Sequence, residues 1–321
     1  MRYSHQIIFE KIGEEGQKKL KKSSITILGL GGIGSRSAEL AARAGIGKLN
    51  LIDRDIVESS NLQRQTLYDE QDINKPKAFV IKEKLEKINS EIKINSKFKD
   101  INYKNIKDNI KGNLVLDCTD NMETRFLLNE FCIEQNIPWI YSAVIGSAGM
   151  VFNIIPKKTP CFNCLFSEPE ERLETCETEG IINTIPALIS SIQLTEALKF
   201  LTHQSLTKEL LYYDLWKQKL EKTKIKKNPN CIACNKKQFS YLAGEKSSEL
   251  IKFCGLNKFQ LYAPQLDLEK VAEKLKKIDN IILNDYCLIF KELMIFKDGR
   301  VIIKADSESK AKTIYSKYIG N

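Results

Sequence analysis

The chain has 321 residues, of which 42% are hydrophobic and 28% are charged, a composition that is ordinary for a soluble globular protein. It contains no apolar run long enough for a transmembrane helix, and its N-terminus lacks the basic-then-apolar layout of a signal peptide. These features argue against a membrane-spanning protein, and we expect a cytoplasmic one without a membrane partner.

The net charge of +9 results from 50 lysines and arginines against 41 aspartates and glutamates. The excess is spread along the chain and rests mostly on lysine, which favours a solvated basic surface over binding to nucleic acid. Such a surface also suits an acidic protein partner.

Strand and helix signals alternate through the first half of the chain. In chain order we expect a strand at 25–30, a helix at 33–46, a strand at 48–53, a helix at 77–91, a strand at 113–120, a helix at 122–135, and strands at 138–144 and 149–156. This alternation predicts a mostly parallel sheet with helices on both faces.

Residues 167–183 are acidic and weakly periodic, and we interpret them as a mobile loop; a helix at 184–201 and an extended segment at 210–225 follow. From about residue 245 the pattern predicts a small α+β unit with a hairpin that turns at Asp298–Gly299. We therefore predict two domains, residues 1–240 and residues 241–321.

The glycines Gly29, Gly31 and Gly34 fit the pattern G-x-G-x-x-G between a predicted strand and a predicted helix, and Asp53 ends the next strand. Glycines allow the backbone to approach a phosphate or sugar, the helix N-terminus attracts phosphate, and an aspartate in this place accepts hydrogen bonds from ribose hydroxyls. On these residues alone NAD is the favoured nucleotide, although the glycine pattern does not name it.

The residues that follow Asp53 differ from those of a dehydrogenase. Asn61, Arg64 and Lys77 bring an amide and two cations, which suits a triphosphate better than a pyrophosphate. The alternative is that Arg64 and Lys77 are ordinary surface residues.

The motif DCTDN, residues 117–121, closes a buried strand at the edge where open α/β sheets bind their ligands. Asp120 there is a candidate ligand for Mg²⁺. The alternative is that Asp120 or Asn121 caps the next helix.

Nine cysteines are present, and four of them form the tight pairs Cys161/Cys164 and Cys231/Cys234, separated by 66 residues. Four thiolates make a closed tetrahedral zinc site that contributes to folding rather than to catalysis. The alternative is two redox-active dithiols, which we disfavour because neither pair is expected to open a helix after a strand.

Several motifs occur together in one order: RYSHQI, GLGGIG, D-x-D followed by SNLQRQ, KPK, DCTDN, the two C-x-x-C pairs and a lone cysteine in the acidic loop. In this combination residues 1–240 resemble the ThiF/MoeB/HesA family, the bacterial relatives of ubiquitin-activating enzymes. The C-terminal unit more weakly resembles an extension of some bacterial members. The resemblance implies a Rossmann-like, E1-like adenylation domain with a structural zinc site, followed by the small α+β domain.

Members of this family use ATP and Mg²⁺ to adenylate the C-terminal glycine carboxylate of a ubiquitin-fold sulfur carrier, ThiS or MoaD, for thiamine or molybdopterin biosynthesis. The resemblance also implies a homodimer and a sulfur donor such as a cysteine desulfurase or a rhodanese. The alternatives are an E1-like cyclase of threonylcarbamoyladenosine on tRNA, an NAD-dependent oxidoreductase, and a scaffold that binds a carrier without activating it.

The resemblance also implies roles for single residues. The catalytic candidates are Arg64, Lys77, Asp120 and Cys176, and the zinc ligands are Cys161, Cys164, Cys231 and Cys234. The nucleotide site that it implies consists of Gly29, Gly31, Gly32, Gly34, Asp53, Ser60, Asn61, Leu62, Gln63, Arg64, Lys77, Asp120 and Asn121.

Two of these expectations carry open alternatives. Cys176 is either a covalent thiol or a loop cysteine without a catalytic role, and its acidic neighbours disfavour the thiolate. His5 stands where the family has a second arginine that reaches into the partner subunit's ATP site, so either ATP is held more weakly, or Arg2 substitutes, or His5 is only a surface residue.

Overall fold

The computed structural model describes residues 2–166, 179–246, 250–252, 258–263 and 266–320. The chain divides into two compact units, one that ends at Lys246 and one that holds the described residues from Leu250 onward. The domain boundary predicted between residues 240 and 241 stays a prediction.

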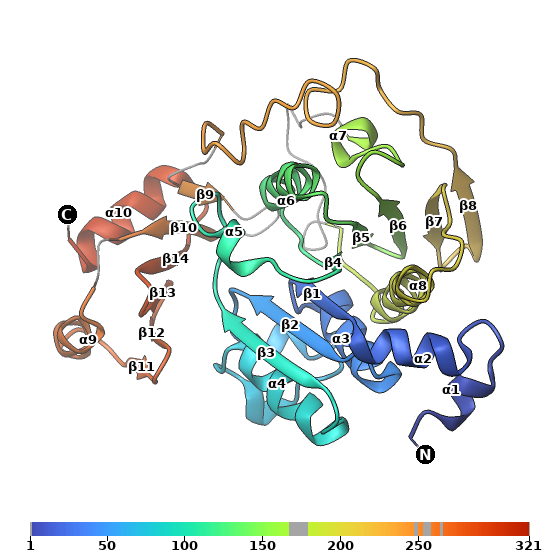
Figure 1. Cartoon of the computed structure of the whole chain (residues 1–321). Coiled ribbons are helices and arrows are strands. Elements are labelled where there is room, and N and C mark those ends of the chain that lie inside the picture. Colours follow the sequence, from blue (N-terminus) through green and yellow to red (C-terminus); the bar gives the residue numbers. More distant parts are fainter. Residues whose placement is uncertain (1, 167–178, 247–249, 253–257, 264–265, 321) are drawn as a thin grey trace. The chain divides into compact units, whose positions relative to one another are not determined.

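The first unit is built on an eight-stranded sheet with the order β3-β2-β1-β4-β5-β6-β7-β8 (Figure 1). The strands from β3 to β5 in this order are parallel, and β6, β7 and β8 continue the sheet antiparallel. The bounds are β1 Ser24–Leu28, β2 Lys48–Asp53, β3 Lys93–Phe98, β4 Leu114–Asp117, β5 Trp139–Ile145, β6 Ala148–Ile154, β7 Leu210–Asp214 and β8 Lys219–Thr223. This is the mostly parallel sheet that the alternating pattern predicts.

Helices cover both faces of this sheet. Their bounds are α1 Ser4–Ile8, α2 Gly13–Lys22, α3 Gly32–Ala44, α4 Lys77–Ile88, α5 Ile106–Asn109, α6 Met122–Gln135, α7 Phe162–Leu165 and α8 Thr184–Leu201. Short 3-10 helices span Ser59–Asn61 and Glu70–Asp72. None of the helices in the described part of the chain has the length and apolar character needed to cross a bilayer.

The central strand β4 is apolar from Leu114 to Leu116 because both of its faces are buried. In β4, Leu114 and Leu116 belong to the core that also contains residues of α3, α4 and α8, whereas Val115 belongs to the opposite core with α6. Alternate side chains of a strand point to opposite faces, so a strand between two helical layers needs hydrophobic residues throughout.

The parallel strands bring three chain segments to one edge of the sheet. Leu28 at the end of β1 is in register with Ile52 of β2 and with Asp117 at the end of β4. The residues that follow these strands therefore meet at the carboxyl edge, where open α/β sheets bind ligands.

The second unit is a six-stranded antiparallel sheet with the order β11-β12-β13-β14-β10-β9. Its strands are β9 Leu250–Lys252, β10 Lys258–Tyr262, β11 Ile282–Leu283, β12 Cys287–Phe290, β13 Leu293–Phe296 and β14 Arg300–Lys304, and its helices are α9 Leu268–Lys276 and α10 Glu308–Tyr318. The predicted hairpin at Asp298–Gly299 joins β13 to β14.

The first unit differs from the prediction in strand β3 and in the helices α1, α2, α5 and α7, which were not predicted. Strand β3 was not predicted, because it is a polar strand at the sheet edge in which only Ile94 is buried. Most of the loop predicted at 167–183 lies outside the described residues, and from its remainder Ile181 forms a bridge with Gly146.

Candidate functional site

The glycine turn lies between β1 and α3 and packs tightly against the loop after β4. Gly29 has a φ of +86°, and a Cβ there would lie 2.7 Å from the carbonyl oxygen of Cys118. A Cβ on Gly34 would collide with the carbonyl oxygen of Gly29. Only glycine fits these two positions, and the turn ends at Gly31, the N-cap of α3, which lacks a side-chain cap. The first N–H groups of α3 are thus available to an anion.

Asp53 holds this turn from the end of β2. Its carboxylate accepts hydrogen bonds from the backbone N–H of Leu30, at 2.5 Å, and of Asp55, at 2.6 Å. Burial raises the pKa of Asp53 to about 6, although the positive charge of Lys77 acts in the opposite direction. A carboxylate has about four lone-pair sites, so Asp53 keeps acceptor capacity for a further ligand.

Lys77 is the first residue of α4 and is buried, with its Nζ 3.5 Å from Oδ2 of Asp55. Burial lowers the pKa of Lys77, but Asp55, Asp53 and other nearby carboxylates outweigh this effect, so the pKa is raised. Lys77 is therefore charged at neutral pH and faces the same carboxyl edge as Asp53.

The segment after the 3-10 helix Ser59–Asn61 brings Arg64 to the glycine turn. Its Cγ lies 3.8 Å from the Cβ position of Gly32, and its Nη1 donates to the carbonyl oxygen of Ser60 at 2.9 Å. Asn61 is buried and accepts a hydrogen bond from the backbone of Glu58.

Leu62 and Gln63, which were also predicted to line the nucleotide, do not contact the glycine turn in the same way as Arg64. Leu62 is partly buried against the core, and Gln63 donates to the carbonyl oxygen of Ile181 at 3.3 Å. Among the five residues from Ser60 to Arg64, the contact with the glycine turn is thus made by Arg64.

Asp120 and Asn121 follow β4 and divide two roles between them. Asn121 is the N-cap of α6, and its side chain accepts from the backbone N–H of Thr124 at 3.2 Å. Asp120 is exposed and forms no hydrogen bond or ion pair with the described residues, yet its charge contributes to the raised pKa of Lys77. The capping alternative thus applies to Asn121 and leaves the carboxylate of Asp120 open.

A buried ion pair beneath this loop was missed by the sequence analysis. Asp117 is fully buried, and its Oδ2 lies 3.3 Å from Nε of Arg125 in α6. The Oδ1 of Asp117 accepts from the backbone and the hydroxyl of Thr119, while Arg125 donates to the carbonyl oxygen of Thr119. The pair therefore fixes the loop that carries Asp120, and a charged residue at the end of an apolar strand was the available signal.

Gln193 of α8 supports the same loop from the opposite face. Its Nε2 donates to the carbonyl oxygens of Asp117, at 2.9 Å, and Ile140, at 3.1 Å, and its Oε1 accepts from the Cys118 thiol. No sequence motif marks Gln193, because its role depends on contacts with distant strands.

The N-terminal segment bears on the alternatives for His5. His5 lies in α1 and is exposed. Arg2 is engaged within its own chain, with Nε 3.2 Å from Glu91 and Nη1 donating to the carbonyl oxygen of Ile88. Ile8, the last residue of this helix, and Phe9 after it are 79% and 58% exposed, an unusual level for large apolar side chains.

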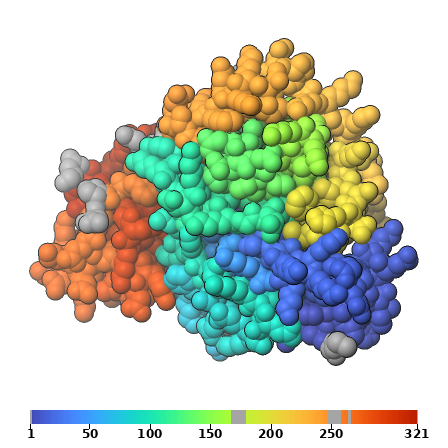
Figure 2. Space-filling model, viewed as in Figure 1, coloured from blue at the N-terminus to red at the C-terminus, as the bar shows by residue number. Residues whose placement is uncertain are grey.

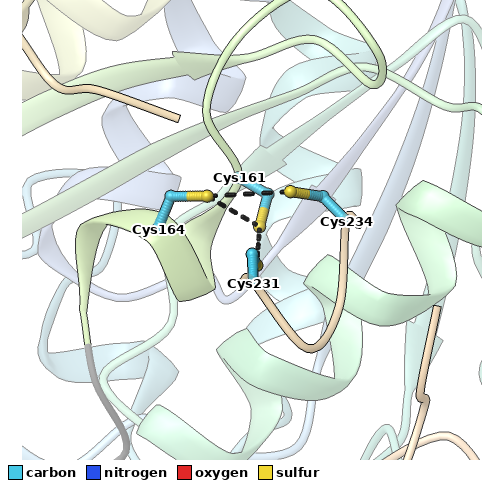
Figure 3. A group of neighbouring side chains, drawn as sticks. All are labelled: Cys161, Cys164, Cys231 and Cys234. Carbon is cyan, nitrogen blue, oxygen red and sulfur yellow. Dashed lines mark hydrogen bonds between the residues drawn. The ribbon is translucent and has the colours of Figure 1, made fainter. Parts of the chain in front are cut away.

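The four cysteines of the two tight pairs lie together in the first unit (Figure 3). The Sγ atoms of Cys161 and Cys164 are 3.8 Å apart, those of Cys161 and Cys231 3.5 Å, and those of Cys164 and Cys234 3.6 Å. Sulfurs at the corners of a tetrahedral zinc site with bonds of about 2.3 Å are separated by roughly 3.8 Å. The thiols thus fit a zinc ion.

The surroundings of the cysteines bear on the choice between a metal site and two dithiols. Cys161 is the N-cap of the one-turn helix α7, so the expectation that neither pair opens a helix was wrong for this pair. Cys231 and Cys234 come from the surface stretch that follows β8, seen at the upper rim of the first unit in Figure 2. Burial and the neighbouring thiols raise the pKa of Cys161, which makes its thiolate form unfavourable in the absence of a metal. A bound cation stabilises the thiolate and removes this cost.

The predicted catalytic thiol cannot be placed in the same way. Cys176 and two of its acidic neighbours lie outside the described residues. Its covalent role stays a prediction.

Comparison with known proteins gives a match to the ThiF family over residues 3–233. The chain belongs to the ThiF family. It is 36% identical to the sulfur carrier protein ThiS adenylyltransferase of Bacillus subtilis, with 99% of each chain covered, and 35% identical to the molybdopterin-synthase adenylyltransferase of Salmonella typhimurium, with 73% of this chain and 96% of the relative covered. The structure of Escherichia coli MccB with ATP is similar with a TM-score of 0.65 and 25% identity, over 73% of this chain and 74% of MccB.

The first prediction from this ThiF-family site concerns the buried ion pair. Arg125→Leu leaves Asp117 as an unpaired buried charge and should lower the free energy of unfolding by about 3–5 kcal/mol. Burial already raises the pKa of Asp117, and the loss of Arg125 raises it further, so the folded state binds this proton more tightly than the unfolded state. The destabilisation should therefore be larger at about pH 8 than at about pH 5, measured by urea unfolding.

Two further variants control this measurement. Arg43→Leu removes a half-exposed partner of Glu39 and should cost at most about 1 kcal/mol. Asp117→Asn combined with Arg125→Leu should restore most of the lost stability. Equal destabilisation by Arg125→Leu at both pH values would contradict the assigned role of Asp117.

The second prediction concerns the four cysteines. The purified protein should contain about one zinc ion per chain by elemental analysis. Cys161→Ser should remove the zinc and lower the melting temperature, because zinc binding is coupled to folding. Cys132→Ala, which alters a buried cysteine outside the cluster, should retain the metal. A metal-free parent with an unchanged melting temperature after chelation would exclude the tetrathiolate site.

Proposed function

We propose that this chain is an ATP-dependent adenylyltransferase that activates the C-terminal glycine carboxylate of a ubiquitin-fold sulfur carrier. Similarity to the ThiS adenylyltransferase of Bacillus subtilis over 99% of both chains is the observation that carries the proposal. The structure supports it with Asp53, Lys77 and Arg64 around a tight glycine turn. These residues provide an acceptor for ribose hydroxyls and cations for phosphate.

In the reaction, one oxygen of the carrier's carboxylate attacks the α-phosphorus of ATP, and the bond to the bridging oxygen of pyrophosphate breaks. Carrier acyl-adenylate and pyrophosphate are the products, and no oxidant or proton donor is required. The protein has to align the two reactants and to stabilise the charge that develops on the departing pyrophosphate. Lys77 and Arg64 supply this positive charge, and Asp53 holds the ribose.

Both metals have residues that fit them. Asp120 would hold Mg²⁺, because its exposed carboxylate is an oxygen ligand without a partner among the described residues. When bound, Mg²⁺ neutralises charge on the phosphates. The four cysteines would hold Zn²⁺ in a closed site that stabilises the fold.

The match over the full length to one ThiS adenylyltransferase favours a ThiS-type carrier over a MoaD-type carrier. The Bacillus relative matches 99% of the chain, whereas the ThiS adenylyltransferase of Escherichia coli and the molybdopterin-synthase relative each match 73% of it, so the C-terminal unit by itself does not distinguish the two carriers. We therefore infer a role in thiamine biosynthesis.

The further partners follow from the family resemblance. A homodimer accounts for the exposure of Ile8 and Phe9 at the end of α1. In this dimer the N-terminal segment that carries His5 reaches the nucleotide of the neighbouring subunit. A sulfur donor, a cysteine desulfurase or a rhodanese, acts after adenylation. Cys176 is proposed as a candidate for the covalent step with the carrier.

The proposal predicts ATP–pyrophosphate exchange that depends on the carrier. Exchange should be supported by a ThiS-type carrier and much less by a MoaD-type carrier. Lys77→Ala should reduce the exchange rate by about a hundredfold, since a buried cation at the phosphates is lost. Lys75→Ala, which changes an exposed lysine two residues earlier, should leave the rate unchanged. Exchange by Lys77→Ala at the parent's rate would refute the assigned site.

The raised pKa of Asp53 predicts a pH-dependent affinity for ribose. Above about pH 6 the carboxylate is ionised and accepts ribose hydroxyls, and as the pH falls through this value Asp53 becomes protonated. Adenosine binding measured by calorimetry should weaken about tenfold one pH unit below this pKa. Dideoxyadenosine, which lacks the two hydroxyls, should bind independently of pH. A flat profile for adenosine would mean that Asp53 does not hold the ribose.

A further inference from the structure

Gln65, the last residue of the SNLQRQ motif, is a buried polar residue beside the glycine turn to which the mechanism above assigns no role. Its side chain is only 3% exposed. Its backbone is fixed, because its N–H donates to Asn61 at 3.0 Å and its carbonyl oxygen accepts from Tyr68 at 3.1 Å. The side chain is therefore held in one place next to the turn.

The amide group of Gln65 lacks hydrogen-bond partners in the described part of the chain. Its Oε1 is completely buried and unpaired, and its Nε2 lies 3.7 Å from the Cβ position of Gly31. Leaving a buried polar group unpaired destabilises a fold, and an apolar side chain of the same size would avoid this cost. A polar residue at this position thus requires another explanation.

The space beside Gly31 provides one for the donor Nε2, whereas Oε1 stays unpaired. Apart from Nε2 of Gln65, and leaving aside Gly31 and its two chain neighbours, no described atom lies within 4 Å of the Cβ position of Gly31. Gly31 is also the N-cap of α3, a helix of 13 residues without a side-chain cap, so its first N–H groups face the same region. A side-chain N–H and the helix N-terminus together form a site for an anion.

The order of contacts along the turn identifies the anion. Asp53, the proposed ribose ligand, contacts Leu30, and Gly31 is the next residue. The first phosphate attached to a ribose at Asp53 therefore falls beside Gly31. We propose that Nε2 of Gln65 donates a hydrogen bond to a non-bridging oxygen of the α-phosphate, the group that the carboxylate attacks. This inference rests on the proposed nucleotide site.

A second buried glutamine provides a matched control. Gln17 is 8% exposed, but its Nε2 donates to the carbonyl oxygen of Ala44 at 3.1 Å and its Oε1 accepts from Gln6 at 2.6 Å. Because its hydrogen bonds are satisfied within the fold, Gln17 is expected to contribute to stability and not to nucleotide binding.

The experiment compares Gln65→Met, Gln65→Glu and Gln17→Met in melting temperature and in binding of adenosine, AMP and ATP. Gln65→Met should melt at or above the parent's temperature and bind AMP and ATP about tenfold more weakly, with adenosine unchanged. Gln65→Glu places an acceptor against the phosphate, so its loss should exceed that of Gln65→Met. Gln17→Met should melt lower and bind all three ligands as the parent does.

Other results would overturn the inference. A lower melting temperature of Gln65→Met with unchanged AMP binding would mean that Gln65 only supports the fold. Weaker binding of ATP without weaker binding of AMP would place its contact at another phosphate, and weaker adenosine binding would place it at the nucleoside. Carrier-dependent exchange by the parent is tested separately, so its absence would count against the proposed function while the AMP result still decides the role of Gln65.

Discussion

The site depends on the close approach of three loops at the carboxyl edge of the parallel strands. Gly29 contacts the loop after β4 so closely that no Cβ fits between them, and Asp53 binds the backbone of the same turn from β2. Because β1, β2 and β4 are adjacent and parallel, the loops after them all begin at the same edge of the sheet. A nucleotide thus meets a surface whose backbone is already positioned, which lowers the entropic cost of binding.

Charge balance is the second constraint on this site. Lys77 is buried among carboxylates, and its pairing with Asp55 keeps it charged before any nucleotide is bound. A triphosphate that contacts Lys77 competes with Asp55 for this cation and adds several negative charges near Asp53 and Asp120. A divalent cation at Asp120 offsets this repulsion, so the same carboxylate that raises the pKa of Lys77 is suited to make binding of the phosphates metal-dependent.

The sequence predicted the long elements that are rich in apolar residues and the motifs near them. The helices predicted at about 122–135 and at 184–201 have these bounds in the structure, and the four cysteines were grouped by their spacing. Strand β3 was missed because an edge strand buries little and has no apolar pattern. Arg125 and Gln193 were missed because their roles come from contacts with residues far along the chain, and spacing does not reveal such contacts.

The four-cysteine cluster bears on the proposed chemistry although it contains none of the reacting groups. Its two cysteine pairs enclose the chain from 165 to 230, which includes α8. Gln193 of α8 binds the carbonyl oxygen of Asp117, and the Asp117–Arg125 pair holds the loop that presents Asp120. Joining both ends of this segment reduces the conformational freedom that α8 must lose on folding. Loss of zinc from the proposed site should therefore affect the position of Asp120 through α8, since the proposed Mg²⁺ ligand depends on a helix that lies within the segment whose two ends the cysteines restrain.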